Sequence, residues 1–163
     1  MIGLFLCLLF FNLHSCIWSK RTSINNQLLN LDISELAAHW NAPILTSFAG
    51  RGIAASSPFS VKVPIHEPEV EEVFAAADAL VVFGSQLDGM NTKNWTIKWP
   101  AKIVIVDANP DFVLRNVNAD AVIVANDINK VARTLVADSK LQENWADVSA
   151  LNTEVRARLE VDE

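Results

Sequence analysis

Residues 79–85, Ala79-Leu80-Val81-Val82-Phe83-Gly84-Ser85, decide the fold of this chain. Bulky apolar side chains follow one another without alternation, and the run stops at Gly84-Ser85. Such a run is typical of a strand buried on both faces, as in parallel sheets that are covered by helices. Similar runs at 103–106 and 122–124 repeat the pattern. The sequence therefore predicts an α/β domain built on a parallel sheet.

Stretches between and after the apolar runs predict the helices that cover the sheet. Asp32, with Glu35 three residues later, has the spacing of a helix N-terminus. Pro68 suits the first turn of a second helix, and Asp127 is placed to cap another. We also expect a helix to begin at Asn109-Pro110-Asp111.

We divide the chain into three parts: a leader or non-native segment at 1–30, a central domain at 31–138, and an amphipathic helix at 139–163 that either caps the domain or links it to an absent one. Nearly all of Met1–Phe11 is apolar, yet no basic residue precedes it and no small-residue cleavage site follows. Three interpretations of the first segment stay open: a leader unrelated to the domain, a real signal or anchor, and a first strand of the domain.

Composition excludes several classes of protein. The net charge of −6 argues against nucleic-acid binding, which needs a basic face. Both cysteines, Cys7 and Cys16, precede residue 20, and the histidines are too scattered for a metal site. We expect a cytoplasmic protein with no nucleic-acid partner, and with no membrane partner unless the apolar N-terminal segment is a true anchor.

A short strand is also expected at 43–47, beginning with Pro43. Mostly polar or small residues stand at the ends of the four predicted strands, at 46–48, 84–86, 107–109 and 126–127. In an open parallel sheet, ligands bind beyond the carboxyl ends of the strands. These residue types suit ribose and adenine, but Ser, Asp and Asn also end strands and cap helices in proteins that bind nothing. The sequence contains no complete catalytic motif, so we expect no catalytic residues in this chain.

Four stretches in order resemble the central domain of thiamine-diphosphate-dependent enzymes, a family that includes acetolactate synthase and the benzoylformate, pyruvate and oxalyl-CoA decarboxylases. They are Ala42–Gly52, Ala77–Ser85, Lys102–Pro110 and Asp120–Asp127. The resemblance extends from about Glu35 to Val136, roughly two-thirds of the chain.

This resemblance implies a six-stranded, Rossmann-like parallel sheet. In some members the domain holds FAD, in others ADP or the nucleotide end of CoA, and in several it holds none. By position, the nucleotide contacts would be Ser47, Phe48, Gly84, Ser85, Asp107, Ala108 and Asp127. The chain has Asn126 where the family usually has glycine, and 19–30 does not supply the family's first strand and glycine-rich turn. We therefore expect the first strand to be missing or replaced.

The resemblance also implies that the whole enzyme binds thiamine pyrophosphate and magnesium through pyrimidine- and diphosphate-binding domains that this chain lacks. We expect these domains as partners, and a homo-oligomer as the whole enzyme. The chain itself would be structural and would hold FAD or ADP. Two alternatives are a stand-alone nucleotide-binding Rossmann-like module and a secreted α/β binding protein.

Overall fold

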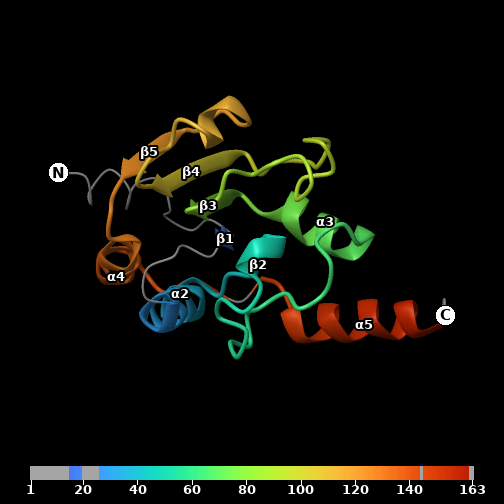
Figure 1. Cartoon of the computed structure of the whole chain (residues 1–163). Helices are drawn as coiled ribbons and strands as arrows, with labels where there is room; N and C mark the ends of the chain where they lie inside the picture. Colours follow the sequence, from blue (N-terminus) through green and yellow to red (C-terminus); the bar gives the residue numbers. More distant parts are fainter. Residues whose placement is uncertain (1–14, 20–25, 144, 162–163) are drawn as a thin grey trace.

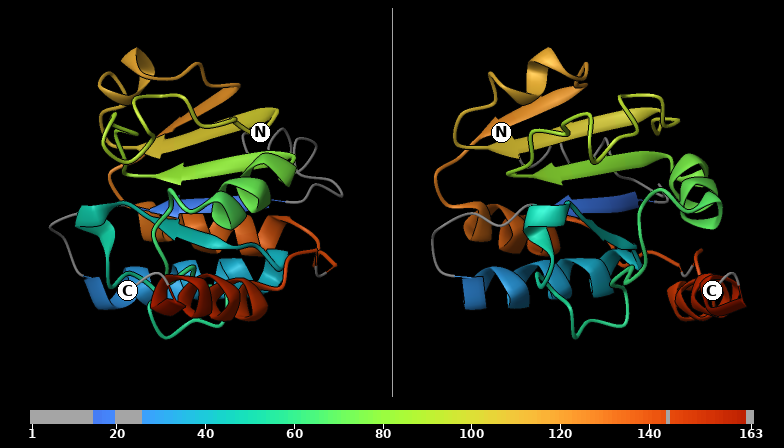
Figure 2. Two further views of the ribbon diagram at one scale, coloured as in Figure 1. Left: turned by 90° about the vertical axis from the view of Figure 1, so that its right-hand side faces the viewer. Right: turned by 45° about the vertical axis from the view of Figure 1, so that its right-hand side comes forward.

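A parallel sheet forms the centre of the molecule. The computed structural model describes residues 15–19, 26–143 and 145–161. The strands are β1 (Ser15–Ser19), β2 (Ile44–Thr46), β3 (Ala79–Phe83), β4 (Lys102–Asp107) and β5 (Ala121–Val124), in the order β2-β1-β3-β4-β5. All adjacent pairs are parallel, and Figure 2 shows the strands running in the same direction. The structure confirms the α/β, Rossmann-like fold.

A further segment extends the sheet beyond β2. Ser60 forms an isolated parallel bridge with Ile44. The Ile44 N–H donates to the Phe59 carbonyl at 2.8 Å, and the Val61 N–H donates to the Ile44 carbonyl at 3.0 Å. The sheet therefore has a doubly wound order. From β1 the chain adds strands toward one edge of the sheet, and from β3 it adds strands toward the opposite edge.

The position of β1 corrects the expectation that the first strand is missing or replaced. Ile17 lies opposite Ile44 of β2 and Val81 of β3, and its side chain is fully buried. β1 therefore occupies a central position in the sheet, although it lies within the range 1–30 that we expected to be a leader. The apolar stretch Met1–Phe11 lies outside the described residues.

Helices cover both faces of the sheet (Figure 1). They are α2 (Asn26–Trp40), α3 (Pro68–Ala76), α4 (Ile128–Asp138) and α5 (Val148–Val161), with short 3-10 helices η1 (Phe48–Gly50) and η2 (Val113–Arg115). One apolar core lies between the sheet and α2 and α4, and a second lies between the sheet and α3, α5 and η2. Two helix layers therefore bury β3 and β4, as their apolar runs predict. The same prediction for 122–124 is wrong, because β5 lies at the edge of the sheet and leaves Val122 and Val124 exposed.

Two predicted helix starts are wrong. Asp32 lies inside α2 rather than at its start, and its carboxylate accepts a hydrogen bond from Arg133 of α4 at 2.7 Å. Burial raises the pKa of Asp32, and the Arg133 guanidinium opposes this rise. The expected helix at Asn109-Pro110-Asp111 is replaced by a turn and η2, because Asp107 and Asn109 accept backbone hydrogen bonds from residues two positions later.

The C-terminal helix is part of the domain's core. α5 begins at Val148, where the Asp147 carboxylate accepts a hydrogen bond from the Ala150 N–H at 2.9 Å. Its Asn152 side chain donates to the Ser60 carbonyl at 2.9 Å and accepts from the Lys62 N–H at 2.7 Å. α5 therefore packs against the outer edge of the sheet. None of the described helices is long and apolar enough to cross a membrane.

Replacing Ile17 with alanine tests whether β1 belongs to the folded sheet. We expect Ile17→Ala to lower the free energy of unfolding by about 2–5 kcal/mol, because it leaves a cavity in the core. Urea denaturation of the full chain measures the change. Val161→Ala is the control, because Val161 is 85% exposed and its loss should cost under about 0.5 kcal/mol. An Ile17→Ala variant as stable as the control would show that β1 does not contribute to the sheet.

Candidate functional site

The two predicted serines lie at the carboxyl edge of the sheet, where their hydroxyls serve local turns. Ser47 follows β2 and accepts a hydrogen bond from the Gly50 N–H at 3.1 Å, which caps η1. Ser85 follows β3 and accepts from the Leu87 N–H at 3.3 Å. Both side chains are buried. Ser47 therefore acts as a helix cap and Ser85 stabilises a local turn.

Four more predicted residues lie at or after the ends of β3, β4 and β5. Gly84 has a φ of +60°, a conformation that favours glycine, and its N–H donates to the Val106 carbonyl at 2.9 Å. Asp107 accepts from the Asn109 N–H at 2.8 Å, and the exposed Asp127 accepts from the Lys130 N–H at 3.0 Å to cap α4. Ala108 is exposed. A nucleotide-binding role for this set stays a prediction.

The sheet separates these residues into two groups. Ser47 and Phe48 follow β2, whereas Asp107 ends β4 and Ala108 comes directly after it, with β1 and β3 between. Three strand spacings of nearly 5 Å place the ends of β2 and β4 about 14 Å apart. The carboxylates Asp107 and Asp127 therefore form one part of the edge, and the β2 end forms another.

A cavity of about 360 Å³ lies beside the end of β2. Its walls come from β2, the η1 loop, the segment that bridges to β2, and the loop after β3. The lining includes Thr46, Phe48, Arg51, Lys62, Ile65 and Asn91. Phe48 is therefore the predicted site residue that contributes to this cavity.

Asn91 joins the two loops of the cavity wall, and sequence reasoning missed it. It is buried, and its side-chain oxygen accepts a hydrogen bond from the Phe48 N–H at 2.9 Å. Its side-chain nitrogen donates to both Asp88 carboxylate oxygens at 2.9 Å. The Asp88-x-x-Asn91 spacing is a signal for the local turn. No local pattern predicts the contact with Phe48, 43 residues away.

The rings of Phe48 and His66 lie 6.2 Å apart, and the His66 Nε2 lies 3.0 Å from the Met90 carbonyl. This contact implies that Nε2 carries the proton and donates it. The hydrogen bond between His66 and Met90 therefore connects the segment before α3 with the loop after β3. Phe48 and Met90 both stay exposed at this edge, at 42% and 74%.

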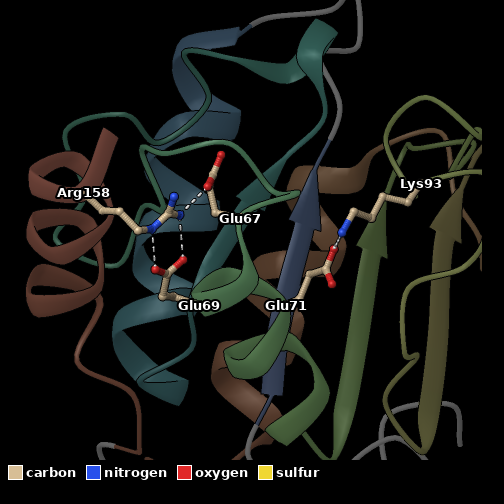
Figure 3. A network of polar contacts seen from close by, with 5 residues as sticks. All are labelled: Glu67, Glu69, Glu71, Lys93 and Arg158. Carbon is tan, nitrogen blue, oxygen red and sulfur yellow. Dashed lines mark hydrogen bonds and ion pairs between the residues drawn. The ribbon is translucent and has the colours of Figure 1, made fainter. Parts of the chain in front are cut away.

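The acidic start of α3 is paired with basic residues, as Figure 3 shows. Arg158 of α5 donates two hydrogen bonds to the Glu69 carboxylate, at 2.8 and 3.0 Å, and another to Glu67. Lys93 pairs with Glu71. Three carboxylates at this helix start, those of Glu67, Glu69 and Glu71, are therefore in ion pairs. The Arg158 hydrogen bonds lower the pKa of Glu69.

In the described ranges no group of three or more His, Cys, Asp or Glu side chains could hold a metal ion. The acidic run at α3 is therefore not a metal site. The aspartates at the carboxyl edge likewise form no such group.

A family model described as "Thiamine pyrophosphate enzyme, central domain" matches residues 28–135. The chain belongs to this family. The match to the thiamine pyrophosphate enzyme central domain confirms the resemblance seen in the sequence, and it contains the whole cavity beside β2. β1 and α5 lie outside the matched range. No curated protein matches the chain.

The ion pairs of Arg158 predict a pH-dependent contribution to stability. The folded-state pKa of Glu69 lies below its ordinary value of 4.5, so this contribution is present above that pH and is lost as the pH falls through the folded-state pKa. We expect the difference in unfolding free energy between the wild type and Arg158→Met to be largest near pH 7 and to shrink below about pH 4.5. Urea denaturation across pH measures it.

Arg156→Met is the matched control, because Arg156 is an exposed residue of the same helix. The difference in unfolding free energy between the wild type and Arg156→Met should change little over the same pH range. A gap for Arg158→Met that stays constant from pH 7 to pH 3 would contradict the ionic origin of this contribution.

Proposed function

We propose that this chain acts as the central domain of a thiamine pyrophosphate-dependent enzyme of the acetolactate synthase or 2-oxo acid decarboxylase type. The family match over residues 28–135 carries the proposal. The doubly wound parallel sheet supports it, because a sheet of this kind presents its loops for ligand binding at one edge. No observation favours a stand-alone nucleotide-binding module.

Within the whole enzyme the domain would be architectural and would hold a nucleotide, FAD or ADP, at the carboxyl edge of the sheet. The cavity beside β2 supports this role, because its volume of about 360 Å³ is that of a small ligand pocket. The predicted residues Ser47, Phe48, Gly84, Ser85, Asp107, Ala108 and Asp127 lie at this edge.

The family resemblance places the glutamate that activates thiamine pyrophosphate, and the Gly-Asp-Gly motif that binds magnesium and diphosphate, in the two other domains of the whole enzyme. We therefore assign the binding of both to the pyrimidine- and diphosphate-binding domains of the whole enzyme. These domains are the proposed partners of the chain. We place the whole enzyme in the cytoplasm as a homo-oligomer.

Two measurements on the full chain test the proposal. Calorimetric titration with FAD, ADP and CoA should give saturable binding of at least one of them. An assay with pyruvate or benzoylformate, supplied with thiamine pyrophosphate and Mg²⁺, should give no turnover, because the proposal places catalysis in other domains. Turnover by the isolated chain would overturn the fragment role, and a folded chain that binds none of the three nucleotides would overturn the nucleotide role.

A further inference from the structure

The cavity beside β2 is lined by cationic side chains and by no carboxylate. Arg51 and Lys62 both belong to its lining, whereas the neighbouring lining residues are apolar or neutral. This is a local reversal of charge in a chain whose net charge is −6. Cations gathered around a concave surface raise the local concentration of anions. The lining therefore favours a negatively charged ligand.

Neighbouring contacts hold the Arg51 side chain and the Lys62 backbone beside the cavity. The Arg51 guanidinium carbon lies 5.0 Å from the centre of the Phe48 ring, a cation–π contact that keeps the charge at the wall. The backbone of Lys62 is fixed by its 2.7 Å hydrogen bond to Asn152 of α5. Among the described residues, neither side chain has an ion-pair partner. Both charges are thus available to a ligand.

The next acidic residues along the chain do not compete for these cations. Glu67 and Glu69 are paired with Arg158, and Glu71 is paired with Lys93 (Figure 3). The carboxyl ends of β4 and β5 differ from the end of β2 in charge. Asp107 and Asp127 place negative charge there, and negative charge repels phosphate.

We propose that the cavity beside β2 binds the phosphate groups of a nucleoside diphosphate, with Arg51 and Lys62 as the residues that neutralise them. The inference rests on the proposed nucleotide role and specifies its ligand and location. A volume of about 360 Å³ lies at the low end of the range for ligand pockets, so it suits a mononucleotide such as ADP better than the larger FAD. The phosphates lie beside β2 rather than beside Asp107.

Calorimetric titration of the full chain with ADP, adenosine and inorganic pyrophosphate tests the inference. The variants are Arg51→Met and Lys62→Met, which keep an apolar stem and remove the charge. We expect each to weaken ADP and pyrophosphate binding about tenfold, because charge-assisted contacts to phosphate are strong. Affinity for ADP should also fall as salt rises, whereas adenosine should bind more weakly than ADP to the wild type.

Arg115→Met is the matched control. Arg115 lies 5.2 Å above the Phe112 ring, in the same kind of contact as Arg51, but on η2 between β4 and β5. Its removal should leave ADP affinity unchanged, which separates a local effect from a change in net charge. Circular dichroism of each variant confirms that the fold is retained.

The outcomes separate the inference from the proposed function. ADP binding that is unaffected by Arg51→Met and Lys62→Met, and lost in Asp107→Ala, would overturn the inference and leave a nucleotide role at the β4 end of the edge. Binding of FAD or CoA without binding of ADP or pyrophosphate would also overturn the inference alone. Binding of pyrophosphate that depends on Arg51, with no nucleotide bound, would support the anion site and contradict the nucleotide role.

Discussion

Burial of β3 on both faces is the constraint on which the rest of the structure depends. Leu80 and Val82 face one core, Val81 and Phe83 face the other, and all four are fully inaccessible to solvent. Such a strand needs a helix layer on each side, and helices between parallel strands provide both layers. Because the strands are parallel, their carboxyl ends meet at one edge, and the loops that could bind a ligand are brought together there.

Strands that are apolar along their whole length could be predicted, and a strand with polar ends could not. β3 and β4 stand out because apolar residues follow one another until Gly84 and Asp107. β1 consists of Ser-Cys-Ile-Trp-Ser, which lacks such a run, and its central place is determined by pairing with β2 and β3. The same limit applies to Asp32: its spacing from Glu35 is typical of a helix start, but its hydrogen-bond partner, Arg133, lies 101 residues away in the sequence.

The candidate site shows the same limit at the level of single side chains. The positions of Ser47 and Asp127 after predicted strands place them at the carboxyl edge of the sheet. Their side-chain oxygens can accept a hydrogen bond from a nucleotide or from a backbone N–H, so the sequence does not decide which partner they have. The cavity depends instead on irregular segments. Lys62 and Asn91 meet the β2 end through long-range contacts, and no periodicity predicts the path of such loops. The side-chain charges differ between the two places: Glu67, Glu69 and Glu71 are in ion pairs, whereas Arg51 and Lys62 have no ion-pair partner in the part of the chain that the structure describes.

These features support the proposal of a ligand site in the cavity beside β2. The most direct measurement is a backbone amide NMR map of the ¹⁵N-labelled full chain during addition of ADP. We predict that the largest chemical-shift changes occur around Thr46, Phe48, Arg51 and Lys62, the lining of the cavity beside β2. Saturable shifts that cluster instead at Gly84, Asp107 and Asp127, or a folded chain whose spectrum does not change, would contradict this assignment.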